Sequence, residues 1–307
     1  MRYGRSRVRV GWIGTGNIGR QMAKHVLEAG HELTVHDLRR EAASELLETG
    51  ARWAASPAEA TRGKDIVFTS LPVPRDVDAV AVGEKGILGA MSGDEVFVDL
   101  TTNSLSMVVK LHKAFLEKGF QMLDAPVSGG VRGAISRDLI VMASGDEATY
   151  RRIKPVLDAM GDKVTYCGPI GNGTICKLCH NLMGAGIVQV VAEVLSLGVK
   201  AGVPLETLAD AISKGASGKA PPLKGWYDTT FKGQFEGTPL SFYLELMRKD
   251  VRLACEMARE LDVPMEIANI VEQRHIDAMN RGWGRNSSNA IVWLQEQRSG
   301  VELRLRS

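Results

Sequence analysis

The segment Gly14-Thr15-Gly16-Asn17-Ile18-Gly19 constrains the fold of this chain more than any other part of it. It fits the pattern G-x-G-x-x-G, follows an apolar run typical of a buried strand (residues 8–13) and opens a run typical of a helix (17–29). In this setting the first glycine makes the tight turn, the second lets the backbone approach a pyrophosphate, and the third lets the helix pack on the strand. A helix N-terminus also favours phosphate groups. We therefore predict a dinucleotide-binding loop, the alternative being a tight turn that binds no ligand.

An acidic residue follows this loop at the spacing that ribose recognition needs. Residues 32–36 are typical of a second strand, and Asp37 lies 18 residues after Gly19. A carboxylate there can accept the ribose hydroxyls of adenosine and repels a 2′-phosphate, so we expect NAD. Arg39 and Arg40 leave NADP possible, since an arginine just beyond the strand could accept that phosphate.

Strand and helix patterns alternate through the first half of the chain. Further strands are expected at residues 65–71, 95–100, 121–124 and 139–144, and Ser56-Pro57-Ala58-Glu59 is typical of a helix start. Only helical patterns follow, at residues 174–201, 204–214, 240–261, 265–281 and 290–297, before a tail that we expect to be solvated (302–306). We predict an α/β fold, with a Rossmann-type doubly wound sheet in residues 1–168 and an all-helical domain in 169–307. The helix at 174–201 is apolar on nearly every turn, which predicts burial on most sides.

Composition excludes several classes of protein. The chain has 307 residues, 38 basic against 36 acidic side chains and four cysteines. This balance gives no reason to expect nucleic acid or a membrane as a partner, and four cysteines do not make a disulfide scaffold. We find no apolar run of the length that a membrane helix needs and no signal peptide, so we expect a cytoplasmic protein.

Several separated motifs point to one family. They are Leu71-Pro72, Asp99-Leu100-Thr101-Thr102, Asp124-Ala125-Pro126-Val127-Ser128-Gly129-Gly130, Gly173 to Asn181 (GTICKLCHN), Phe242 and Lys249-Asp250. In this order they resemble the β-hydroxyacid dehydrogenases, which include 3-hydroxyisobutyrate dehydrogenase and tartronate semialdehyde reductase. The resemblance runs from about residue 8 to 297.

The resemblance implies a role for each motif. Lys177 would be the catalytic acid/base. The substrate would be a small carboxylate, bound by Ser128, Gly129, Gly130, His180, Asn181, Phe242 and Asp250. The cofactor, NAD or NADP, would be bound by Gly14, Gly16, Asn17, Ile18, Asp37, Leu71, Pro72, Thr102 and Lys249. It also implies hydride transfer between the nicotinamide and a hydroxy acid or semialdehyde, no metal, and a homodimer or homotetramer.

The residues themselves support part of this assignment. Lys177 and Asn181 are spaced i and i+4, so they share one face of a helix and can reach one small ligand. Apolar neighbours argue against a surface position for Lys177, and burial would make its amine a better base. Ser128-Gly129-Gly130 is a plausible anion cradle, although a purely structural turn is the alternative.

Some features depart from the family or admit another interpretation. Arg137-Asp138 stands where many relatives have Gly-Thr, which leaves substrate identity open. His180 could meet the substrate or pack within the helix. Cys176-Lys177-Leu178-Cys179-His180 matches the c-type haem pattern C-x-x-C-H, but its helical setting favours small packing cysteines over haem or zinc. The remaining alternatives are an imine reductase, disfavoured by Lys177, and a non-catalytic binding relative.

Overall fold

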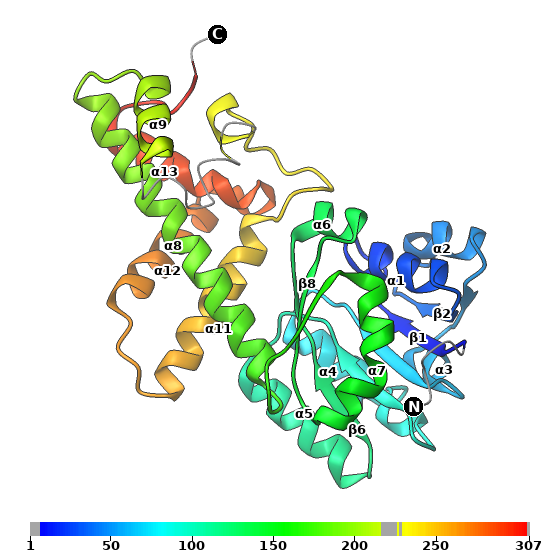
Figure 1. The fold of residues 1–307 in the computed structure, drawn as a ribbon. Helices are drawn as coiled ribbons and strands as arrows, with labels where there is room; N and C mark the ends of the chain where they lie inside the picture. The colour runs from blue at the N-terminus through cyan, green and yellow to red at the C-terminus, as the bar shows by residue number, and fades with distance from the viewer. Residues whose placement is uncertain (1–6, 216–225, 227–228, 306–307) are drawn as a thin grey trace. The chain divides into compact units, whose positions relative to one another are not determined.

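The computed structural model describes residues 7–215, 226 and 229–305. It divides into two compact units, Met1–Lys177 and Leu178–Ser307 (Figure 1). Each unit has its own apolar core. Tyr227, an aromatic residue whose place in the sequence suits either a pocket wall or the core, lies outside the described residues.

A six-stranded parallel sheet forms the centre of the first unit. Its strand order is β3-β2-β1-β4-β5-β6, which is the order of a doubly wound dinucleotide-binding domain. The Rossmann-type prediction is therefore confirmed. The strands are β1 (Arg9–Ile13), β2 (Glu32–His36), β3 (Arg52–Trp53), β4 (Ile66–Thr69), β5 (Val96–Asp99) and β6 (Gln121–Asp124).

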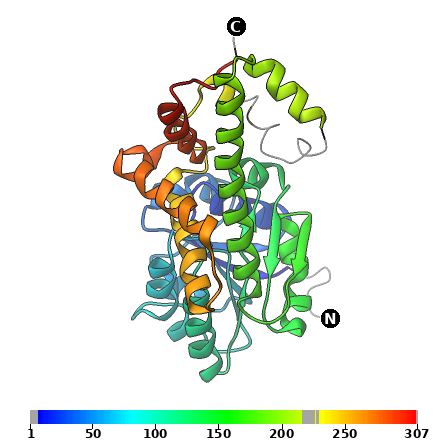
Figure 2. The ribbon, with the colours of Figure 1, turned by 90° about the vertical axis from the view of Figure 1, so that its left-hand side faces the viewer.

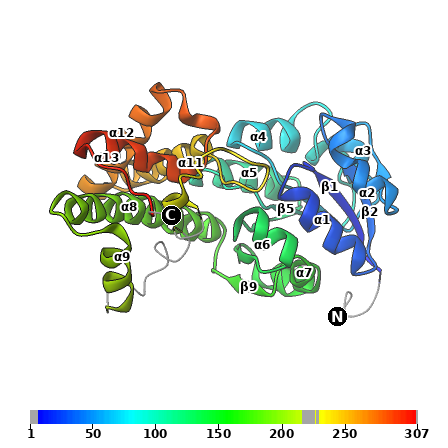
Figure 3. The ribbon, with the colours of Figure 1, turned by 90° about the horizontal axis from the view of Figure 1, so that it is seen from above.

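Helices cover both faces of this sheet because successive strand residues point to opposite sides. Trp12 and Phe68 join the apolar core on the face of α1 and α7, whereas Ile13 and Val67 join the core beneath α3, α4 and α5 (Figure 3). The helices of this unit are α1 (Gly19–Glu28), α2 (Ser44–Glu48), α3 (Pro57–Thr61), α4 (Pro74–Val82), α5 (Leu105–Glu117), α6 (Gly130–Ser136) and α7 (Glu147–Met160). The expected start of α3 is confirmed, since Ser56 Oγ accepts the Glu59 N–H.

A second, smaller sheet was not expected. It has the order β7-β8-β9, from Val127–Ser128, Ile140–Ala143 and Lys163–Tyr166. We expected only the middle strand. β7 has only two residues. β9 has four, and its two exposed residues, Lys163 and Thr165, are polar. Neither strand therefore has a strong apolar pattern in the sequence. β7 pairs antiparallel with β8, whereas β8 pairs parallel with β9, so this small sheet is mixed.

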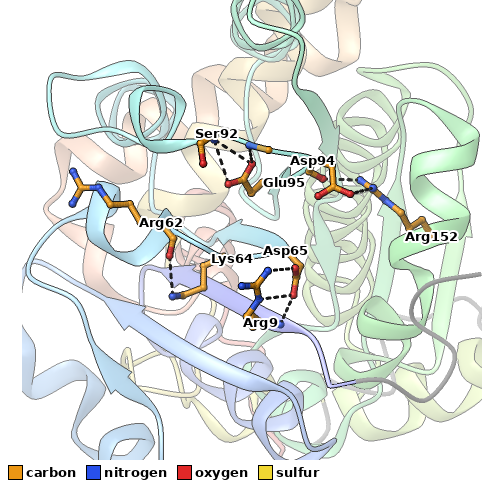
Figure 4. A network of polar contacts seen from close by, with 9 residues as sticks. Arg9, Arg62, Lys64, Asp65, Ser92, Asp94, Glu95 and Arg152 are labelled. Carbon is orange, nitrogen blue, oxygen red and sulfur yellow. Dashed lines mark hydrogen bonds and ion pairs between the residues drawn. The ribbon is translucent and has the colours of Figure 1, made fainter.

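Polar contacts tie together the amino ends of the strands (Figure 4). Arg9 Nη2 lies 2.7 Å from Asp65 Oδ1, and this ion pair joins β1 to the residue before β4. Burial acts to raise the pKa of Asp65, but the hydrogen bonds from Arg9 outweigh it and hold that pKa below its ordinary value. A cavity of about 220 Å³, lined by Arg9, Arg52 and Lys64 among others, opens at this edge. The glycine loop follows the opposite, carboxyl ends of the strands, so this cavity is separate from it.

The second unit is helical. Its helices are α9 (Leu205–Lys214), α11 (Leu244–Glu260), α12 (Glu266–Asn280) and α13 (Val292–Ser299), together with most of α8 (Asn172–Lys200). One core lies among α8, α11 and α12, around Ala185, Val251 and Val271 (Figure 2). A larger one contains Trp226, Phe231, Phe235 and the residues around α13.

Two expectations about this unit are wrong. The helix α8 is not buried on most sides: only 22% of its most apolar 18-residue window is buried. That window has a mean hydropathy of 1.9, and by length and composition the helix could cross a membrane. We had expected no apolar run of that length from the sequence. The C-terminal tail is not fully solvated, because Leu303 is buried and Arg304 pairs with Glu296 at 2.6 Å.

Candidate active site

The three glycines of the loop differ in what surrounds them. Gly14 has φ +95°, and a Cβ there would lie 2.3 Å from Ser70 O. A Cβ on Gly19 would lie 2.3 Å from Gly14 O, so helix α1 packs directly on the turn. Gly16 has no heavy atom within 4 Å of the position a Cβ would take. The loop thus has a turn, an open backbone face and a close helix contact, and these residues fit a dinucleotide pyrophosphate.

Asp37 lies beside this loop. Its Oδ2 accepts hydrogen bonds from Thr15 N at 2.8 Å and Thr15 Oγ1 at 3.1 Å, and its Oδ1 accepts from Arg39 N at 3.0 Å. The carboxylate therefore also holds the loop in place. Arg39 and Arg40 are both exposed beyond the strand, and the Arg40 guanidinium lies 5.2 Å from the centroid of the Trp53 ring.

The next two strands end in a network that fixes the segment after β4. Buried Asp99 accepts hydrogen bonds from Thr69 Oγ1 (2.8 Å), Thr101 N (3.0 Å) and Asn103 Nδ2 (2.8 Å). Burial raises the pKa of Asp99, and these hydrogen bonds act against the rise. Thr101 Oγ1 in turn accepts the Leu71 N–H at 3.0 Å. Leu71 borders the glycine loop, since its Cδ2 would lie 2.9 Å from a Cβ on Gly14. Pro72 and Thr102 adjoin these residues in the chain.

The segment Ser128-Gly129-Gly130 forms a sharp turn between β7 and α6. Gly129 and Gly130 have φ values of +133° and +62°, which L side chains rarely adopt. A Cβ on Gly129 would meet Asp138 O at 2.9 Å, whereas Gly130 faces open space. Arg137, which ends α6, has φ +62° and so occupies a left-handed position that suits glycine.

Lys177 lies in the second turn of α8 and is 7% exposed. The first turn of this helix is held by Asp124 at the end of β6, whose carboxylate accepts the N–H groups of Gly171 and Thr174 at 2.8 and 2.7 Å. The lysine side chain is therefore carried by a part of the helix that is anchored to the first unit.

A polar cluster of the second unit contains three of the expected site residues. Asn181 Nδ2 donates to Asp250 Oδ2 at 2.6 Å, and Lys249 Nζ lies 3.0 Å from Asp250 Oδ1. Asn181 and Asp250 are 6% and 1% exposed. Asp250 thus fixes the amide orientation of Asn181 and balances the charge of Lys249. Phe242 is half-buried, and His180 is exposed.

Comparisons with known proteins find matches for both halves of the chain. A family model for the NAD-binding domain of 6-phosphogluconate dehydrogenase matches residues 9–168, more than half of the chain. A second, for the NAD-binding region of NADP-dependent 3-hydroxyisobutyrate dehydrogenase, matches residues 171–294. The chain is similar to 2-(hydroxymethyl)glutarate dehydrogenase of Eubacterium barkeri, with 32% identity over 96% of this chain and 97% of that protein. It is also similar to mitochondrial 3-hydroxyisobutyrate dehydrogenase of Drosophila melanogaster, with 31% identity over 94% and 89%.

The chain belongs to the β-hydroxyacid dehydrogenase family. A solved structure of Mycobacterium tuberculosis 3-hydroxyisobutyrate dehydrogenase with L-serine has a TM-score of 0.82, 27% identity, and coverage of 94% of this chain and 99% of that one. The protein is accordingly a hydroxyacid dehydrogenase that binds NAD(P). Similarity to the imine reductase of Myxococcus stipitatus, at 17% identity and a TM-score of 0.61 over 93% and 99%, extends to the fold alone.

The two cysteines around Lys177 are not the small packing residues that we expected. Cys176 and Cys179 are both exposed on α8, because they lie on the face of the helix opposite its buried residues. The helix is continuous through the C-x-x-C-H segment. Among the described residues no group of three or more His, Cys, Asp or Glu side chains could hold a metal ion.

Three residues that hold the segments of this candidate site were not predicted from the sequence: Thr15, Asp99 and Asp124. All three fall inside motifs that we recognised, yet none was given a role. Asp99 and Asp124 are register partners on neighbouring strands, each the last residue of its strand. An acidic residue at the end of an apolar strand was the available signal, because a charge that close to a core needs partners.

Proposed function

We propose that this protein interconverts a short hydroxy acid and its semialdehyde, with Lys177 as the acid/base. The neutral Lys177 amine takes the proton of the substrate hydroxyl during oxidation, and the ammonium returns it during reduction. When bound, NAD(P) would accept or supply the hydride at the same carbon. Asn181, oriented by Asp250, presents its amide oxygen to the reacting group, while Ser128, Gly129 and Gly130 hold the substrate carboxylate. His180 and Phe242 complete the substrate contacts.

The observation that carries this proposal is the burial of Lys177 and Asn181 one turn apart on α8. Lysine is almost never buried unless it has a specific partner or function. An amine and an amide at this spacing can reach a single small ligand. A lysine at this position also weighs against the imine reductase and non-catalytic alternatives.

We further propose that NAD is preferred to NADP. Asp37 places a carboxylate beside the glycine loop, where a 2′-phosphate would be repelled. The pyrophosphate would lie over Gly14, Gly16, Asn17 and Ile18. Leu71, Pro72 and Thr102 would line the nicotinamide end of the cofactor site, and Lys249 is a further cofactor contact that the family resemblance implies. Leu38, next to Asp37, is 99% exposed, and an adenine ring would cover it.

The third part of the proposal is a homodimer or homotetramer located in the cytoplasm. Met183, Ile187, Val190, Val194 and Leu197 recur on α8 at intervals of four and three residues, the spacing of a coiled-coil seam. Four of the five are between 47% and 72% exposed, and we name these five residues the α8 stripe. A second copy of the chain would cover it, since an identical stripe is self-complementary. We also propose a domain boundary near residue 168, in the loop before α8, whereas the two compact units divide after Lys177.

A substitution of Lys177 tests the proposed chemistry. Wild-type protein is first offered 3-hydroxyisobutyrate, L-serine and 2-(hydroxymethyl)glutarate with NAD+ or NADP+, because relatives carry these substrates in their names. Lys177→Ala should lower kcat by at least about 100-fold, as expected for loss of a general acid–base group. Lys177→Arg should restore little, because a guanidinium stays protonated.

The control is Lys200→Ala, which removes an exposed lysine from the far end of the same helix. It should leave kcat within about twofold of wild type, and NADH fluorescence should show unchanged cofactor affinity in all three variants. Oxidation by wild type should also become faster as pH rises and the amine loses its proton. A Lys177→Ala variant with more than about a tenth of the wild-type kcat would assign the proton transfer to another residue.

A further inference from the structure

The N-terminus of α8 is held by side chains that lie far away in the sequence. Asp124 Oδ1 accepts the Gly171 N–H at 2.8 Å, and Asp124 Oδ2 accepts the Thr174 N–H at 2.7 Å. Ser144 Oγ donates to Asp124 Oδ1 and accepts the Gly173 N–H at 2.9 Å. These two buried residues together satisfy three N–H groups at the start of the helix, which otherwise lack partners within it.

Other helices of the first unit are capped from their own chain segment. Ser56, Ser104 and Asp146 each accept an N–H three residues further on. The two N–H groups that bind the Asp124 carboxylate lie 47 and 50 residues after it. A local cap only stabilises its helix, whereas this one also fixes the helix against strand β6.

The contact between this helix and the strands leaves no room for a side chain at position 173. A Cβ on Gly173 would lie 2.2 Å from Met142 O and 3.1 Å from Asp124 Oδ2. Asp124 and Ser144 also bond to each other through their backbones, with N–O distances of 3.2 and 2.7 Å. The first turn of α8 is therefore packed closely against the strands and held by the Asp124 carboxylate, and Lys177 follows Thr174 by three residues.

We propose that Asp124 is a positioning residue that sets where the Lys177 side chain stands relative to Ser128-Gly129-Gly130. This inference rests on the proposed role of Lys177. Strand β6 ends at Asp124, four residues before Ser128. The Asp124 side chain therefore links two parts of the chain. One is the segment proposed to bind the substrate carboxylate, and the other is helix α8, which carries the proposed acid/base. A small displacement of a reacting group costs much rate, because proton transfer needs hydrogen-bond distance.

Asp124→Asn tests the proposal with a side chain of the same shape. The carboxylate accepts on both oxygens, whereas an amide must point its NH2 at one of the facing N–H groups. We expect kcat with 3-hydroxyisobutyrate, or the panel acid that wild type oxidises fastest, to fall about 10- to 100-fold. The Kd for NADH should stay within about twofold, because the glycine loop is untouched.

Asp146→Asn is the matched control, since Asp146 caps α7 by accepting the Thr149 N–H and hydroxyl, both at 2.7 Å. It should lower the Tm by a similar amount and leave kcat within about twofold. A merely structural role for Asp124 would give both variants the same kinetic behaviour, and that result would overturn the proposal.

A double-mutant cycle with Lys177→Ala separates the two proposals. If Asp124 acts through Lys177, Asp124→Asn should lower the residual rate of Lys177→Ala by less than about threefold. A full 10- to 100-fold further loss would overturn the positioning role. If Lys177→Ala alone stays active, the proposed acid/base fails instead.

Ser144→Ala keeps the test decisive if Asp124→Asn does not fold. It removes only the hydroxyl that joins Asp124 to Gly173, and we expect kcat to fall about three- to tenfold in a folded protein. A folded Ser144→Ala variant with wild-type kcat would contradict the proposal.

Discussion

Asp37 holds the glycine loop with the same carboxylate that we expect to meet the adenosine ribose. Its two oxygens already accept hydrogen bonds from Thr15 and Arg39, yet the side chain stays half-exposed at the loop. Carboxylate oxygens have about four acceptor positions, so both roles fit one residue. The charge that we propose excludes a 2′-phosphate thus also stabilises the loop.

Asp37→Asn should therefore change cofactor preference without a large change in shape. We expect the ratio of kcat/KM for NAD+ over NADP+ to fall at least about tenfold, or about 1.4 kcal/mol. Arg39→Ala is the companion variant, and it should weaken activity with NADP+ but not with NAD+. A wild-type enzyme that already prefers NADP+ tenfold would show that Arg39, and not Asp37, decides the preference.

Elements with strong apolar patterns were predicted well from the sequence, and weak ones were not. The bounds of β2 and β6 match the expected ranges, because each is a buried strand between clear turn signals. β3 and β7 have two residues each and form only through tertiary pairing. The glycine loop could be predicted because its parts are adjacent in sequence. The links from Asp124 to α8 could not, because they join residues 47 to 50 positions apart.

The end of α6 gives a prediction at the scale of an element. Arg137 holds a left-handed conformation, which costs an L-residue about 1–2 kcal/mol. Arg137→Gly should raise the free energy of unfolding by about 1 kcal/mol and the Tm by a few degrees. Arg132→Gly, in the exposed interior of the same helix, should lower both. A lower Tm for Arg137→Gly would mean that its contact to Asp158 O outweighs the strain.

For the whole molecule, the α8 stripe predicts how copies assemble. Val190→Asp and Leu197→Asp each place a charge on the stripe, so sedimentation should show a shift to smaller species. Glu193→Ala changes a neighbouring exposed position and should leave the assembly intact. A wild-type protein that sediments as a monomer would contradict the homo-oligomer, and one that partitions into lipid vesicles would assign the stripe to a membrane.

The boundary between the two units falls inside helix α8 rather than in a loop. This has a consequence for chimeras that exchange the helical unit with a relative. A junction in the loop at residues 168–171 would import the whole helix, including the residues at positions 173 and 174 that must fit the recipient's Asp124 and Met142. Donor segments with any side chain at position 173 should give insoluble or inactive hybrids, whereas a junction after Lys177 would keep the original fit.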